Sequence, residues 1–302
     1  MATTNSSVVG PRARPESLHA PERRLPARRV GSWQVRAEQG LGAPLRLLGT
    51  WLFLWALSLG PAVFEASADD VARGASIAAR PQRLYEEAKA RWRRETNGVE
   101  AAWQFGRAAF DLAELAPNDS RRAALANEGV DACRRAIALD PKSAGAHYYL
   151  GLNYGQLAQT KLLGALKLVE QMEEAWKTTI ALDPNFDYAG GHRTLGVLYR
   201  DAPGWPTSIG SRAKARQHLQ KALELRPDYP GNRLSLYEAY VKWGEQHLVQ
   251  DQARATEDFL KTARARFPGE AWALDWQDWD KRWQTIKAGC SVVRARSPRE
   301  SR

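Results

Sequence analysis

The chain has 302 residues, of which 44% are hydrophobic and 12 are Trp, so it can bury a sizeable core. Its two Cys exclude a disulfide framework and a cysteine zinc ribbon, and its five His include no close pair, so we expect no metal site and no cofactor. The net charge of +10 lies mostly at the ends: residues 1–68 carry eight Arg and four Glu, residues 289–302 carry four Arg and one Glu, and residues 69–288 carry 32 basic and 29 acidic side chains. A nearly neutral body of mixed sign does not indicate nucleic-acid binding.

The first 68 residues have the order of an export signal. Residues 1–46 are rich in Arg, Pro and Ala without an apolar period, and we expect a disordered basic extension. Residues 47–68 contain an uncharged apolar run at 47–59, then Gly60-Pro61, and then Ala66-Ser67-Ala68 before two Asp. This order predicts a secretory signal peptide cleaved after Ala68 and a periplasmic or secreted protein. The alternative is an uncleaved inner-membrane anchor over residues 47–64, although a span takes about 20 apolar residues. No Cys follows the run, so lipid attachment there is excluded.

The remaining chain predicts an all-α fold built from four repeats. Apolar residues recur at spacings of three and four, in stretches broken by Pro or Gly. Each repeat over residues 99–268 ends in a similar motif, seen first as Ile137-Ala138-Leu139-Asp140-Pro141, whose prolines follow at Pro184, Pro227 and Pro268. An upstream motif, Leu-Gly followed by Tyr, occurs at Leu150-Gly151 and again at Leu195-Gly196.

These motifs resemble tetratricopeptide repeats (TPR). The resemblance implies a superhelical solenoid of antiparallel helix pairs, in which small residues let helix A and helix B approach closely and Pro follows helix B. The residues beyond the usual repeat length fall between helices A and B, at 160–168, 201–211 and 244–252. Residues 185–245 are similar to one subgroup, the periplasmic TRAP-transporter T-components and the regulator-of-microtubule-dynamics relatives. The T-components are lipid-anchored, oligomeric, and act beside a substrate-binding protein.

Helices are predicted on both sides of the repeats. Residues 81–98 place Leu84, Tyr85, Ala88 and Trp92 on one face and predict an N-terminal flanking helix. Residues 269–288 carry Trp272, Trp276, Trp279 and Trp283 at steps of 4, 3 and 4, which predicts a C-terminal capping helix; the alternative is an exposed aromatic surface for a partner or membrane. Residues 289–302 are expected to be a disordered basic tail.

The Cys and His residues are interpreted as structural. Cys133 is expected in the core and Cys290 in the tail, without a bond between them. His147 and His192 occupy the same repeat position on different helices, which favours a role in repeat packing over metal binding.

The sequence contains no phosphate loop, nucleophile elbow or paired-His zinc motif, so we do not expect an enzyme. The repeat register places exposed helix A positions on the concave face, and the binding residues that we predict there are Tyr148, Gln156, Arg193, Arg200, Glu238 and Lys242, beside the apolar Leu152, Val197 and Leu234. Trp205, in the loop 201–211, is expected to pack back on the solenoid. This mixture suits an extended peptide or a small anionic ligand; the alternative is an ordinary solvated face.

Two functional hypotheses follow. The first is a non-catalytic exported TPR scaffold that binds a protein or peptide partner through its concave face. The second is a ligand-handling accessory component of a periplasmic transport system, similar to a T-component, with transport-system subunits as partners.

Overall fold

The structure is a computed structural model that describes residues 68–161 and 164–296. Over these residues the chain forms helices and no strand, as predicted. The extension 1–46 and the signal segment, except Ala68, lie outside the described residues. The helices are α1 (Ala68–Arg94), α2 (Val99–Glu114), α3 (Asp119–Leu139), α4 (Ala144–Gln159), α5 (Ala165–Leu182), α6 (Phe186–Asp201), α7 (Arg212–Leu225), α8 (Pro230–Lys242), α9 (Gln246–Gln250), α10 (Ala253–Arg266), the 3₁₀ helix η1 (Glu270–Trp272) and α11 (Ala273–Arg296).

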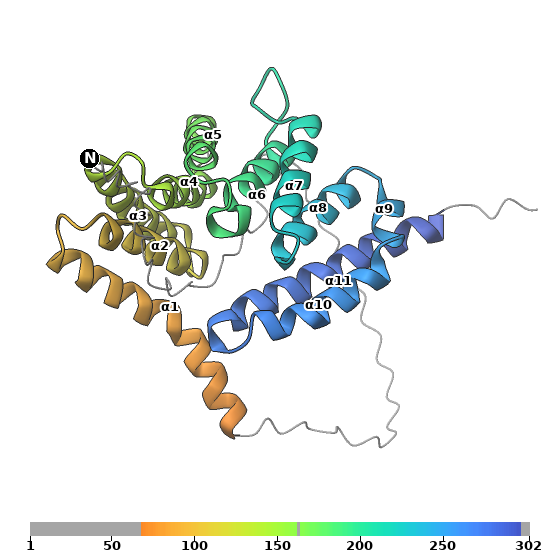
Figure 1. Cartoon of the computed structure of the whole chain (residues 1–302), viewed down its shortest axis with the longest axis horizontal. Helices are drawn as coiled ribbons and strands as arrows, with labels where there is room; N and C mark the ends of the chain where they lie inside the picture. Colours follow the sequence, from red (N-terminus) through yellow and green to blue (C-terminus); the bar gives the residue numbers. More distant parts are fainter. Residues whose placement is uncertain (1–67, 162–163, 297–302) are drawn as a thin grey trace, which may run out of the picture.

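The repeats form consecutive helix pairs, which confirms the predicted solenoid. Helices α2 and α3, α4 and α5, and α6 and α7 pack as pairs, and each pair packs on the next (Figure 1). Helix B of every repeat ends two residues before the predicted proline. The connections between helices A and B overlap the predicted segments, but α5 already begins at Ala165 and the third connection contains the short helix α9.

Glycines explain why the first three pairs are close. A Cβ built at Gly106 would lie 2.3 Å from Cys133 Sγ, and one at Gly151 would lie 2.4 Å from Trp176 Nε1. Gly196 meets Leu219 of α7 in the same way. In each of these pairs, the glycine of helix A therefore leaves room for the side chain that helix B places opposite it.

The fourth repeat departs from this pattern. Its position equivalent to Gly196 is Tyr237, whose hydroxyl lies 3.4 Å from Thr256 Oγ1 of α10. Helices α8 and α10 do not approach as the other pairs do, because the phenol ring needs the space that glycine leaves open. Helix α11 packs on α8 and closes this end of the solenoid.

The tryptophan stripe lies in the core at the end of the solenoid. All four indoles are buried, and Trp279 is only 1% exposed. Trp276 donates its Nε1 hydrogen to the carbonyl of Phe267, at 2.8 Å. The helix also continues to Arg296, past residue 288, so the part of the predicted tail from 289 to 296 is helical. Cys290 is buried there, because α11 packs its last turns near α9, where Gln250 donates to the carbonyl of Cys290.

The N-terminal flanking helix is longer than predicted. It begins at Ala68 instead of residue 81, contains Pro81, and bends along its length (Figure 1). A proline inside a helix removes one hydrogen bond and clashes with the preceding turn, which accounts for a bend. Tyr85 and Trp92 pack on Phe105 of α2, as the predicted apolar face requires.

The loop between α6 and α7 protrudes from the solenoid (Figure 1). It is closed at its base by a hydrogen bond from Gly210 N to Pro203 O at 2.8 Å, and Ser211 caps α7. The expectation that Trp205 packs back is wrong: the side chain is 89% exposed, because the closed base directs the tip of the loop outward.

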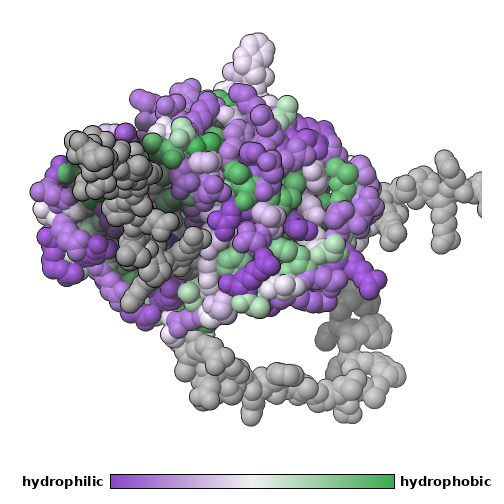
Figure 2. Space-filling model, viewed as in Figure 1, coloured by the Kyte–Doolittle hydropathy of each residue, from purple (hydrophilic) through white to green (hydrophobic). Residues whose placement is uncertain are grey.

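The visible face of the molecule is mainly hydrophilic, with small hydrophobic patches between the polar residues (Figure 2). No helix in the described part of the chain combines the length and the apolar character that crossing a membrane requires.

Candidate functional site: a cleft inside the solenoid

A cleft of about 720 Å³ lies on the inner side of the solenoid. Its lining comes mainly from four places that are distant in sequence: α1, α2, the first turn of α6, and the η1–α11 segment. The two ends of the solenoid meet beside it, since Ser76 Oγ of α1 donates to Glu270 Oε1 of η1 at 3.1 Å. The cleft is therefore bordered on both sides by the flanking helices.

One face of α2 forms a wall of the cleft. Glu100, Gln104, Arg107, Asp111 and Glu114 follow one another at steps of 4, 3, 4 and 3, and all of them line the cleft. This spacing places side chains on a single helix face. The opposite side of α2 carries Ala and Phe and enters the core.

The first turn of α6 has an unusual backbone that forms a second wall. Asp187, Tyr188 and Ala189 have φ values of 50°, 57° and 60°, so three consecutive residues with a Cβ are left-handed. This conformation costs about 1–2 kcal/mol for each such residue. The segment 187–189 requires support from its surroundings, and Asp187 and Tyr188 line the cleft.

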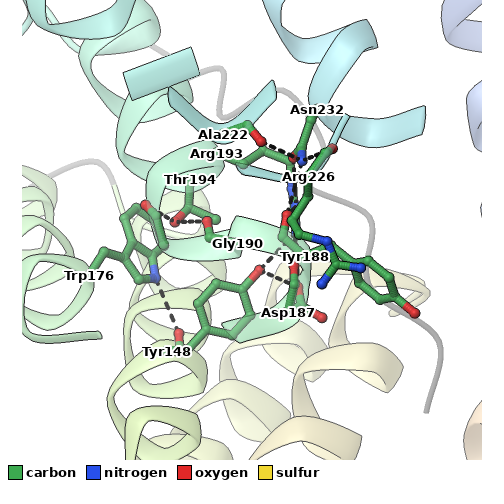
Figure 3. Close-up of polar contacts among 11 residues, drawn as sticks. Tyr148, Trp176, Asp187, Tyr188, Gly190, Arg193, Thr194, Ala222, Arg226 and Asn232 are labelled. Atoms are coloured by element: carbon green, nitrogen blue, oxygen red, sulfur yellow. Dashed lines mark hydrogen bonds and ion pairs between the residues drawn. The ribbon is translucent and has the colours of Figure 1, made fainter. Parts of the chain in front are cut away.

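A buried polar network supplies that support (Figure 3). The Arg193 guanidinium, only 1% exposed, donates to the carbonyls of Asp187 and Tyr188 and binds the Asp187 carboxylate at 2.9 Å. Tyr148 donates to the same carboxylate at 2.7 Å. Asn232 of α8 accepts from Arg193 and donates to the carbonyl of Tyr188, both at 3.0 Å. Residues from α4, α6 and α8, which belong to three successive repeats, thus hold the left-handed segment in place.

A second network joins the end of α6 to α8 and α11. Glu238 accepts from Arg200 at 3.2 Å and from Arg282 Nε at 2.6 Å. Asp201 pairs with Arg200 at 2.7 Å and with Lys242 at 2.9 Å. Burial alone raises the pKa of Glu238, but the Arg282 and Arg200 guanidiniums outweigh burial and lower it. These ion pairs fix α6 and α8 against the cap.

The residues that we predicted on the concave face fall into these two networks. Tyr148 and Arg193 belong to the first, and Arg200, Glu238 and Lys242 to the second; none of them lines the cleft. The buried Gln156 joins neither, and its amide oxygen has no hydrogen-bond partner within the described residues. An open face was expected, but most of these side chains are buried, because the next helix A packs over them: Tyr148 meets α6, and Arg193 and Arg200 meet α8. Their role in binding stays a prediction.

The sequence analysis missed the α2 wall and the left-handed segment. The polar spacing on α2 was available as a signal, since its five positions alternate regularly with an Ala-rich face. The left-handed backbone at 187–189 had no such signal. Glycine usually marks this conformation, and the segment contains none, while the residues that stabilise it, Arg193 and Asn232, lie outside it.

The histidines and cysteines lie apart from the cleft. His192 and His218 place their Nδ1 atoms 3.0 Å apart on α6 and α7, whereas His147 bonds the carbonyl of Pro141. Both Cys are free and buried, and burial raises the pKa of the Cys133 thiol. Among the residues that the structure describes, no three His, Cys, Asp or Glu side chains gather as a possible metal site.

Comparison with a solved structure supports the repeat fold. A thermophilic TPR protein of Thermus thermophilus, TTC0263, aligns with a TM-score of 0.51 and 20% identity, over 72% of this chain and 96% of that one. This chain has a tetratricopeptide-repeat fold. The structure of MamA also aligns, with a TM-score of 0.39 and 19% identity, over 68% of this chain and 98% of that one. The sequence profile described as regulator of microtubule dynamics protein 1-3 matches residues 66–198, which is under half of the chain. No curated protein matches the sequence.

Proposed function

We propose that this TPR protein is a non-catalytic scaffold that binds an extended segment of a partner protein in its cleft. The fold supports the coarse part of this proposal, because repeat solenoids use their inner surfaces to bind other chains. The observation that carries the proposal is the cleft itself. Its volume of about 720 Å³ lies in the range of roughly 300–1,000 Å³ that is usual for binding sites.

The lining of the cleft suits a polypeptide. Trp103 stacks on Tyr149 with ring centroids 5.6 Å apart, and Phe186 meets Trp103 edge to face. Gln104 and the charged residues of α2 add hydrogen-bonding groups beside this aromatic wall. The strained segment 187–189 is held by buried hydrogen bonds, and a wall ordered in advance lowers the entropic cost of binding.

Filling the cleft tests the proposal. Peptides are selected from a random library displayed on phage against the full chain, and their affinities are then measured for two variants. Gln104→Trp places an indole in the cleft, whereas Gln217→Trp places one on the exposed side of α7. We expect the selected peptides to bind Gln104→Trp at least tenfold more weakly and Gln217→Trp as tightly as the wild type.

Two results would contradict the proposal: no enriched peptide, or equal affinity for both variants. Melting temperatures check that each variant folds. If Gln104→Trp melts early, Leu84→Trp fills the cleft from α1 instead, and the same loss of affinity is expected.

We further propose that the chain is exported to the periplasm or secreted, with cleavage after Ala68. The support is the order of the apolar run 47–59 and Ala66-Ser67-Ala68 in the sequence. Amino-terminal sequencing of the native protein is expected to begin at Asp69. A cytoplasmic protein that retains residues 1–46 would refute export.

The alternative function is that of a ligand-handling accessory of a periplasmic transport system. The observation that favours it is the cleft volume, which also fits a small ligand. Native mass spectrometry of the purified full chain decides between the two. A bound compound of constant small mass that is absent from Gln104→Trp would favour the accessory role.

A further inference from the structure

The loop between α6 and α7 holds a tryptophan in solvent. Trp205 is 89% exposed, the largest exposed fraction among the large hydrophobic side chains that the structure describes. Ile209, in the same loop, packs against the core, and the loop projects from the solenoid (Figure 1). The backbone N–H groups of Thr207 and Ser208 donate to the carbonyl of Gly204, at 3.1 and 3.2 Å. The loop is therefore anchored and ordered, and it presents Trp205 outward.

A second exposed apolar side chain lies near the base of this loop. Gln159 at the end of α4, Ala202 after the end of α6 and Val169 of α5 line one small pocket, so the α4–α5 and α6–α7 connections are neighbours. Leu166 is 44% exposed and lies about one turn before Val169 on α5. Trp205 and Leu166 thus belong to the same edge of the solenoid.

We call residues 159–161, 164–167 and 202–214 the loop edge. Its four cations are exposed, and no Asp or Glu lies among these residues. The cations are Lys161, Lys167, Arg212 and Lys214. The folded body as a whole is mixed in sign, with 32 basic and 29 acidic side chains over residues 69–288. The loop edge is therefore more basic than the rest of the body.

The carboxylates beside the loop edge do not neutralise it. Glu245, in the α8–α9 connection, pairs with two Arg of α7. Asp201, at the base of the loop, has a side chain that is 7% exposed and pairs with two cations. Glu170 and Glu173 lie one to two turns further along α5, and Glu173 pairs with Lys177 at 2.7 Å. The three Lys of the loop edge therefore leave it positive.

An apolar tip surrounded by cations matches the surface of an anionic membrane. An indole ring with its N–H group favours the boundary between lipid and water. Lys side chains are attracted to anionic headgroups, and their apolar stems extend along the interface. A membrane surface is broad, so it can meet the tip of the loop and the neighbouring connection together. A protein groove that received Trp205 alone would leave Leu166 and the Lys side chains without a contact.

We propose that the loop edge docks on an anionic phospholipid membrane, with the Trp205 ring at the level of the headgroups. Leu166 adds a second apolar contact, and Lys161, Lys167 and Lys214 bind phosphate groups. No residue of the loop edge lines the cleft, so this inference does not depend on the proposed function.

A dye placed in the loop tests the proposal on the full chain. Thr207→Cys provides an exposed attachment site near Trp205 for the environment-sensitive dye NBD, and the unsubstituted chain, whose two Cys are buried, gives the background. We expect the emission to shift to shorter wavelength and to rise at least twofold on vesicles of phosphatidylcholine and phosphatidylglycerol. Vesicles of phosphatidylcholine alone are expected to give a smaller change. The dye reports the position of the loop, so binding of the apolar run 47–59 to the same vesicles does not imitate this signal.

The apolar contact has its own controls. The same dye on Thr262→Cys, at an exposed position of α10, is expected to stay in water. Trp205→Ala is expected to reduce the rise at position 207 by at least half. Leu182→Ala shortens another exposed apolar side chain, at the opposite end of α5, and is expected to leave the rise unchanged.

The charge is tested by two double variants with equal loss of charge. Lys161→Gln/Lys167→Gln is expected to reduce the rise at position 207 by at least half on the anionic vesicles. Lys261→Gln/Lys281→Gln removes two exposed cations from α10 and α11 and is expected to leave it unchanged.

Several results would overturn the proposal. A loop dye that responds to neither kind of vesicle would exclude the membrane and leave a protein as the partner of Trp205. Equal responses at positions 207 and 262, or equal effects of Trp205→Ala and Leu182→Ala, would show adsorption that does not involve the loop edge. Equal responses to both kinds of vesicle, or equal effects of the two Lys double variants, would refute recognition of anionic headgroups.

Discussion

Replacing Asn232 by Ala removes the link between α8 and the left-handed segment 187–189. The amide accepts from Arg193 and lies 3.0 Å from the carbonyls of Tyr188, Ala222 and Arg226. Its two hydrogens limit it to about three full hydrogen bonds, one of them to a charged group. At about 0.5–1.5 kcal/mol for each neutral bond and about 1.5–3 for the charged one, the loss amounts to about 2.5–6 kcal/mol. No further penalty is added for the carbonyls of Ala222 and Arg226, since both also accept from backbone N–H groups.

The assay is thermal unfolding together with hydrogen exchange. At about 2–4 °C for each kcal/mol, a loss of this size lowers the melting temperature by about 5 °C or more. We expect faster exchange at residues 187–193 in particular, because the left-handed backbone loses its support. Asn153→Ala is the control, since Asn153 also bridges backbone carbonyls of α2 and α4 but holds no left-handed segment. Equal shifts in both variants, with unchanged exchange at 187–193, would refute this role of Asn232.

Three further predictions follow from the packing. Gly151→Ala lowers the free energy of unfolding by about 1–3 kcal/mol in urea denaturation, because the new Cβ would lie 2.4 Å from Trp176 Nε1. Deleting residues 270–302 causes aggregation or a large loss of stability, since each buried indole contributes about 2–3 kcal/mol; light scattering and melting curves measure it. Burial, and then the neighbouring His192, lower the pKa of His218 to about 4 in the folded chain. The unfolded chain therefore takes up this proton at higher pH than the folded chain, and the free energy of unfolding falls as the pH drops from 7 towards 5. His218→Gln flattens that part of the pH profile.

Each of these predictions has a matched control. Gly74→Ala meets nothing within 4 Å and is expected to leave stability unchanged or slightly higher. Deleting residues 297–302 is expected to be silent. Gln217→Asn, at an exposed position of the same helix without a titratable group, keeps the pH profile of the wild type. A shortened chain that stays monomeric with an unchanged melting temperature would contradict the structural role of the cap.

The helix pairs were predictable because the repeat marks both ends of each pair. The prolines after helix B end it wherever they occur, and the Leu-Gly motif requires a close neighbour at one defined position. The contact between Gly151 of helix A and Trp176 of helix B is an example, since the positions of both residues in the repeat are read from the sequence. The fourth pair was less predictable, because Tyr237 changes the distance between its helices and that effect depends on α11.

The candidate site was not predictable in the same way. The cleft exists because α1 and η1 meet, and Ser76 and Glu270 are 194 positions apart in the sequence. The backbone of Tyr188 is determined by Arg193 and Asn232, of which the second belongs to the next repeat. The position of a residue in the repeat predicts the helix face on which it lies. It does not predict whether a later helix covers that face.

The meeting of α1 with η1 has a consequence for the way in which a bound chain enters. A segment with a free end can thread past the joined ends, whereas a segment between two folded domains must wait until they separate. The contact from Ser76 to Glu270 is an exposed hydrogen bond, and such bonds contribute only about 0.5–1.5 kcal/mol. Separation therefore costs little, and Pro81, inside α1, allows the first half of that helix to bend away while the second half stays packed on α2. Association with an internal segment would then be limited by this opening, so its rate would level off as the concentration of the partner rises, while the rate for a free chain end would keep increasing.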